Sequence, residues 1–179
     1  MKTTEYRRKL QKLIEDLPIE AERLCIEQAQ SGLTIVKGRS TSKGIYVDSL
    51  DGNYAEYSTN PIPSWFFNGK QRNQAGSEFI KKNRITTWHQ FRQAQGLTSE
   101  KVNLSYTNRM WTSISIVRTA QIDGGVMVVI GSTDDRVQRY LPFLAKRYGN
   151  FINPTASEKA DLQMDTIRGI LFYTKTRLT

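Results

Sequence analysis

The stretch WTSISIVRTAQIDGGVMVVIG, residues 111–131, decides the fold class. Its first part alternates, with Ile114 and Ile116 on one face and small polar residues between them, which is typical of a β-strand. Asp123-Gly124-Gly125 is a strong hairpin-turn signal. The VMVVIG that follows is rich in the β-branched residues that favour strands. The stretch therefore predicts an antiparallel β-hairpin.

Two helices are predicted after the hairpin. Asp134 or Asp135 is expected to cap the first helix, and Gly149 is expected to end it. Pro142 inside this pattern either weakens the helix or moves its start. The second helix opens at Pro154-Thr155 and closes the chain. Its apolar side is expected to be made by Leu162, Ile167, Ile170, Leu171 and Tyr173.

Helical patterns also precede the hairpin. Residues 88–95, WHQFRQAQ, predict a short helix that Gly96 terminates. Residues 1–32 carry apolar side chains at steps of three and four, which predicts an N-terminal helix that ends at Ser31-Gly32. Pro18 either kinks this helix or starts a second one.

Residues 33–85 have a different character. Gly, Ser, Asn, Asp and Pro recur every few residues, which predicts loops with brief strands such as Ile45–Asp48. The region also holds too many aromatic residues for a disordered tail, among them Trp65, Phe66 and Phe67. An ordered, loop-rich arm is therefore expected, lying either on its own core or on a neighbouring subunit.

These elements predict an α+β fold in a single domain over residues 1–179. The domain would comprise an N-terminal helix (1–32), a loop-rich arm (33–85) and an α+β core (86–179), with the β-hairpin packed against helices. The lone Cys25 is expected to be a small buried hydrophobic residue and not a reactive thiol.

The charge of the chain is strongly positive. Its 179 residues include 26 Lys and Arg against 17 Asp and Glu, giving a net charge of +9. Residues 60–120 hold nine basic residues and two acidic ones. Such a field favours polyanionic partners. No stretch approaches the roughly 20 apolar residues that span a bilayer, so no membrane partner is expected.

Catalytic patterns are not evident in the sequence. His89 is the only histidine, which excludes a two-histidine metal site within one chain, and no nucleophile elbow or phosphate-binding loop occurs. Asp123, Asp134 and Asp135 would suit a metal-dependent nuclease, although a turn and a helix start explain them equally. We therefore expect a protein that is not an enzyme and that has no cofactor or metal.

Several motifs, in order along the chain, resemble one viral family. Trp88, Phe91-Arg92 and Gly96 form the first block, and Val102-Asn103-Leu104 leads to Thr107-Asn108-Arg109-Met110. The late blocks are Lys146-Arg147-Tyr148-Gly149 and Pro154-Thr155 with Glu158. With Gly52-Asn53-Tyr54 upstream, this order resembles head-to-tail connector, neck and tail-completion proteins of tailed bacteriophages, and is similar to those of Bacteroidetes (crAss-like) phages. Asn108 stands where the family often has Gly, but Asn is the next-best residue for a positive φ.

The resemblance implies a structural virion protein of the neck or tail. Such subunits form homo-oligomeric rings on the portal or on an adjacent neck or tail ring, around the DNA channel. Trp88 and Trp111 would belong to the core or to the ring interface, and Arg109 to an interface or an internal carboxylate partner. The full set of expected interface residues is Trp65, Phe66, Phe67, Trp88, Arg109 and Trp111.

Packaged DNA would be contacted through phosphate and without regard to base sequence. The basic residues expected to face the channel are Lys70, Arg72, Lys81, Lys82, Arg84 and Arg92. The alternative to a connector is a free-standing, sequence-independent nucleic-acid-binding protein that uses aromatic stacking between basic residues.

Overall fold

The computed structural model describes residues 3–45, 54–104, 108–123 and 125–179. It confirms the α+β class, with helices and two antiparallel sheets of two strands each. The chain divides into two compact units. The first comprises Met1–Lys37, Thr112–Leu141 and Ile152–Thr179, and the second comprises Gly38–Trp111 and Pro142–Phe151. The single domain over residues 1–179 stays a prediction.

The N-terminal helix α1 runs from Thr3 to Ser42 without a break at Pro18. The predicted end at Ser31-Gly32 is wrong. Gly32 keeps a helical backbone, and a Cβ on it would lie 3.2 Å from Leu162 Cδ1, so this glycine permits a close approach between helices. The helix ends instead just before Gly44, which has a φ of +103° and is suited to leaving a helix.

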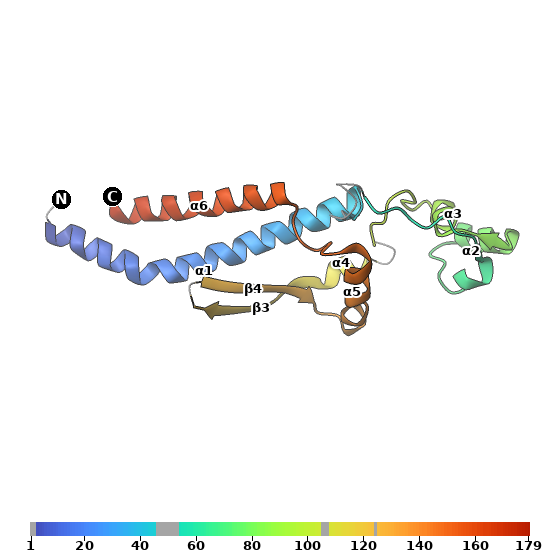
Figure 1. The fold of residues 1–179 in the computed structure, drawn as a ribbon, viewed down its shortest axis with the longest axis horizontal. Helices are drawn as coiled ribbons and strands as arrows, with labels where there is room; N and C mark the ends of the chain where they lie inside the picture. The colour runs from blue at the N-terminus through green and yellow to red at the C-terminus, as the bar shows by residue number, and fades with distance from the viewer. Residues whose placement is uncertain (1–2, 46–53, 105–107, 124) are drawn as a thin grey trace. The chain divides into compact units, whose positions relative to one another are not determined.

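The closing helix α6 (Ala156–Leu178) lies antiparallel along α1 in the first unit (Figure 1). Near its start, Leu162 faces Gly32, and further along, Gly169 lies against Leu24. At the far end, Lys9 Nζ donates to the backbone oxygen of Thr179 at 3.0 Å. Thr155 and Glu158 form the expected start of α6 as a complete capping box.

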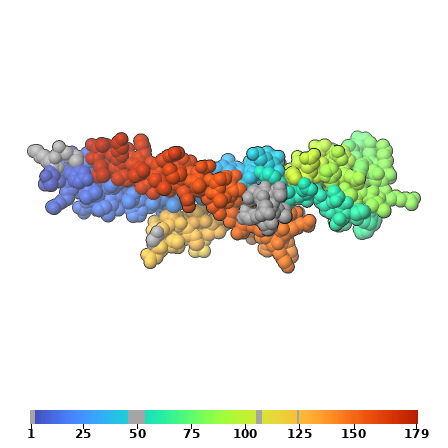
Figure 2. Space-filling view, turned by 45° about the horizontal axis from the view of Figure 1, so that its top comes forward, coloured from blue at the N-terminus to red at the C-terminus, as the bar shows by residue number. Residues whose placement is uncertain are grey.

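The hairpin of β3 (Ile114–Ile122) and β4 (Gly125–Ser132) confirms the prediction from residues 111–131. Its strands pair Ile114 with Ser132 and Ile122 with Gly125, with one register shift between Ile116 and Arg118. Lys37 Nζ donates to the carbonyl of Ile114 at 2.6 Å, and Gln121 donates to Glu22 at 3.1 Å. In both views α1 lies between the hairpin and α6 (Figures 1 and 2).

Helix α5 (Asp135–Tyr148) follows β4 and contains Pro142. Asp134 is its cap, because Asp134 Oδ1 accepts from the backbone N–H groups of Arg136 at 2.9 Å and Val137 at 3.3 Å. Val137 is fully buried. Gly149, with a φ of +66°, ends the helix as predicted.

Asp134→Ala is expected to lower the free energy of unfolding by about 1 kcal/mol, because two N–H groups of the first turn lose their acceptor. Urea denaturation followed by circular dichroism measures this change. The matched control is Asp135→Ala, on an exposed neighbour, with an expected change within about 0.5 kcal/mol. Equal losses in the two variants would contradict the assignment of the cap.

The second unit contains most of the predicted arm. Its elements are β1 (Ile62–Pro63), the 3-10 turn η2 (Ser64–Phe67), α2 (Gln74–Lys82), β2 (Ile85–Thr86), α3 (Trp88–Ala94) and α4 (Arg109–Ser113), whose last two residues belong to the first unit. Residues 33–42, predicted as arm, are helical instead. Of the predicted strand Ile45–Asp48, Ile45 lies outside any described strand and the other three residues are not among those described.

Candidate interaction surface

An aromatic cluster anchors the turn η2 in the second unit. Phe67 is fully buried, with its ring centroid 4.3 Å from that of Phe91 and 5.1 Å from that of Trp88. Phe66 meets Phe67 edge-to-face at 5.5 Å. Edge-to-face and tilted contacts of this kind add to the stabilisation from burial alone. The cluster therefore fixes η2 on α3.

The same turn presents two aromatic side chains to solvent. Trp65 is 70 % exposed and Phe66 is 39 % exposed. Asn68 N–H donates to the carbonyl of Trp65 at 3.1 Å, and Lys70 N–H donates to that of Phe67 at 3.0 Å. Lys70 Nζ lies 3.6 Å from the centre of the Phe66 ring, a cation–π contact. Trp65 and Phe66 are therefore held on an ordered turn and extend outward from it.

The predicted interface set is thus divided by the structure. Trp65, Phe66 and Arg109 lie on the surface, and Trp88 is half-buried. Phe67 and Trp111 are corrected to core residues. Trp111 donates its indole N–H to the carbonyl of Asn103 at 2.7 Å and packs edge-to-face on the Phe151 ring at 6.2 Å.

Arg92 is also corrected, because it does not face a channel. Its side chain is 2 % exposed, and Nε donates to the carbonyl of Thr98 at 2.6 Å. Nη2 donates to Asn103 Oδ1 at 3.2 Å, and the guanidinium lies 4.3 Å from the centre of the Tyr57 ring. Arg92 is therefore an internal strut of the second unit. The chain pattern gave no warning, since an Arg two turns from its acceptors has no local signature.

Tyr57 completes this buried polar group. Its hydroxyl donates to Asn103 Oδ1 at 3.1 Å. Burial raises the pKa of the Tyr57 phenol above its usual range, partly offset by the nearby Arg92 charge. The hydroxyl therefore stays protonated at neutral pH and keeps its donor role.

The other predicted basic residues lie at or near the surface. Lys81, Lys82 and Arg84 are exposed at the end of α2 and just beyond it, and Arg72 is exposed before α2. Lys70 is half-buried because it covers the Phe66 ring. A basic surface therefore surrounds the C-terminal end of α2.

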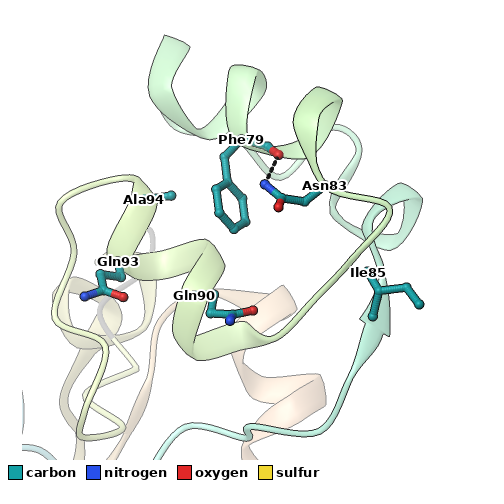
Figure 3. Close-up of a pocket in the computed structure, with 6 residues that line it drawn as sticks. All are labelled: Phe79, Asn83, Ile85, Gln90, Gln93 and Ala94. Atoms are coloured by element: carbon teal, nitrogen blue, oxygen red, sulfur yellow. Dashed lines mark hydrogen bonds between the residues drawn. The ribbon is translucent and has the colours of Figure 1, made fainter.

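An open groove of about 510 Å³ lies beside this basic surface (Figure 3). Phe79, Ile85 and Ala94 supply apolar walls. Asn83, Gln90 and Gln93 supply amide groups, and Asn83 Nδ2 donates to the carbonyl of Phe79 at 2.8 Å. The groove has no titratable lining residue, so it is suited to binding a ligand and not to acid–base catalysis. The sequence offered no signal for it, because its residues come from two helices and a strand.

Metal chemistry and membrane insertion find no support in the described part of the chain. No group of three or more His, Cys, Asp or Glu side chains is placed there to hold a metal ion. Among the helices that the structure describes, none has the length and apolarity required to cross a bilayer.

Comparisons with known proteins end without a match. No protein-family model matches the chain, and neither curated proteins nor solved structures match it. The phage-connector resemblance stays a prediction that rests on the sequence motifs.

Proposed function

We propose that this chain is a structural, ring-forming subunit of the neck or tail of a tailed phage, located in the virion around the DNA channel. In this role it performs no catalysis. It joins copies of itself to one another and to the portal or an adjacent ring.

The observation that carries the proposal is the exposure of Trp65 on a fixed turn. Solvent-exposed tryptophans that are rigidly presented are typical anchors of protein–protein contacts, because they bury a large area at little cost in side-chain entropy. Phe66 extends the anchor, and the buried Phe67 stack behind it limits its motion. A stacking platform for nucleic acid would favour several aromatic side chains along one basic groove, whereas here the two exposed rings project from a turn.

The basic surface around α2 supports the DNA part of this proposal. Lys81, Lys82 and Arg84 are exposed charges on flexible side chains, which suit transient phosphate contacts with a moving duplex. The same three residues favour the second candidate, a free-standing nucleic-acid-binding protein. The two candidates differ in whether the chain assembles with itself and with virion proteins.

The proposed function is tested by complementation in the phage that encodes the chain, with its gene deleted. Wild type and Trp65→Phe are expected to restore tailed particles, whereas Trp65→Ala is expected to reduce infectious particles by at least about tenfold, since loss of an anchor typically costs about 2 kcal/mol of binding. Electron microscopy of the lysates should then show heads without tails. Normal tailed virions from the deletion itself would refute the proposal.

A further inference from the structure

Helix α6 carries large apolar side chains that its own chain leaves uncovered. Leu171 is 63 % exposed and Phe172 is 74 % exposed, and Met164 and Ile167 are about half exposed. Met164, Ile167 and Leu171 follow steps of three and four, so they form one stripe with Phe172 beside it. No residue of α6 is buried. In the space-filling view α6 covers α1 and is itself open on the face shown (Figure 2).

A second exposed stripe lies on the N-terminal part of α1. Tyr6, Leu10 and Ile14 follow one another at steps of four, and each is substantially exposed. The contacts between α1 and α6 place this stripe at the C-terminal end of α6, since Lys9 bonds to Thr179 and Leu24 already faces Gly169. The two stripes are therefore separate surfaces of the first unit. Contiguous exposed apolar surface of this kind marks an interaction site.

The two stripes lie among opposite charges. Residues 3–12 carry four bases and one acid, and three of those bases, Arg7, Arg8 and Lys12, are exposed. Residues 156–165 carry three acids and one base, with Asp161 and Asp165 exposed. Each surface therefore has an apolar stripe, and the charges beside the two stripes are of opposite sign.

We infer that the α1 stripe of one copy (Tyr6, Leu10, Ile14) packs on the α6 stripe of a second copy (Met164, Ile167, Leu171, Phe172). The bases beside the first stripe then face Asp161 and Asp165 of the neighbour. Because two different surfaces meet, the contact is heterologous, and it repeats from copy to copy until a ring closes. This inference rests on the proposed function in taking a ring as the product, and it assigns the surfaces that form it.

Charge reversal on each surface tests the contact. Arg7→Glu with Arg8→Glu and Lys12→Glu changes the α1 surface, and Asp161→Lys with Asp165→Lys changes the α6 surface. Each variant alone is expected to weaken self-association by at least about tenfold in analytical ultracentrifugation. The two variants mixed in equal amounts are expected to associate again, because the reversed charges are complementary. Failure of the mixture to associate, or unchanged association of both single variants, would overturn the inference.

The apolar part of the contact is tested separately. Ile167→Ser with Leu171→Ser should abolish self-association while circular dichroism and the melting temperature stay unchanged, since both side chains are already exposed. The control Ile85→Ser changes a similarly exposed residue in the second unit and should leave association unaffected. Binding of wild type to anionic lipid vesicles, lost in the Ile167 and Leu171 variant without any self-association, would identify a membrane surface as the occupant and overturn the inference.

The outcomes separate this inference from the proposed function. A wild-type chain that stays monomeric at its highest soluble concentration, yet restores tailed particles in the complementation assay, refutes the stripe contact and leaves the function standing. A chain that self-associates through the stripes, and whose deletion leaves virions intact, supports the contact and refutes the function.

Discussion

Phe67→Ala is expected to lower the free energy of unfolding by about 4 kcal/mol, because a fully buried aromatic ring is replaced by a cavity. The ring contacts of Phe67 with Phe91 at 4.3 Å and Trp88 at 5.1 Å are lost together. The loss also releases η2 from α3, so the turn that presents Trp65 would lose its anchor.

Urea denaturation followed by tryptophan fluorescence measures this effect, with Trp88 as a reporter beside the altered site. The matched control lies on the same turn: Trp65→Ala removes a larger ring that is 70 % exposed, and its expected stability change is within about 0.5 kcal/mol. A small loss for Phe67→Ala, or a comparable loss for Trp65→Ala, would show that the cluster does not hold this turn.

Arg92→Ala is the second large effect, with an expected loss of about 3 kcal/mol. The substitution leaves the carbonyl of Thr98 and the Oδ1 of Asn103 without a charged donor inside the unit, and it removes the guanidinium that lies on the Tyr57 ring. Buried acceptors that lose their donor cost more than the mean value of a hydrogen bond.

Two controls separate the role of Arg92 from its charge. Arg92→Lys keeps the charge but lacks the planar fork that reaches two acceptors, so an intermediate loss is expected. Arg84→Ala removes an exposed charge of the same type and should leave stability within about 0.5 kcal/mol. If Arg92→Ala instead weakened DNA binding with no loss of stability, the residue would belong to the channel as first predicted.

The parts of the fold that local chemistry specifies were predicted from the sequence. The hairpin followed from Asp123-Gly124-Gly125 between β-branched runs, and the starts of α5 and α6 followed from Asp134 and Thr155. Asn108, placed where a positive φ was expected, has a φ of 55°. Each of these signals acts within a few residues, so the sequence alone contains it.

Features that depend on distant contacts were missed. Gly32 resembles a helix terminator, yet it admits Leu162 from α6, more than a hundred residues away. Arg92 resembles a surface charge, yet Asn103 and Tyr57 enclose it. The apolar side chains of α6 predicted a core-facing helix, and the structure leaves Ile167 and Leu171 exposed. An amphipathic pattern identifies an apolar stripe but does not say whether the same chain or another copy covers it.

The candidate surface was predicted in part for the same reason. Trp65 and Phe66 were placed correctly on the surface, whereas their neighbour Phe67 was not. Adjacent aromatic residues on a tight turn point in different directions, and the sequence does not assign which ring packs inward. One turn therefore combines a residue expected to govern stability with one expected to govern assembly.

The most direct test of the central claim is mass photometry with negative-stain imaging of the purified chain, alone and mixed with portal or neck particles from virions. The proposed function predicts closed rings of the chain, or a ring-shaped layer on the portal assembly. A monomer that ignores those particles but retards DNA in a salt-sensitive gel would contradict it, and would identify the chain as a nucleic-acid-binding protein.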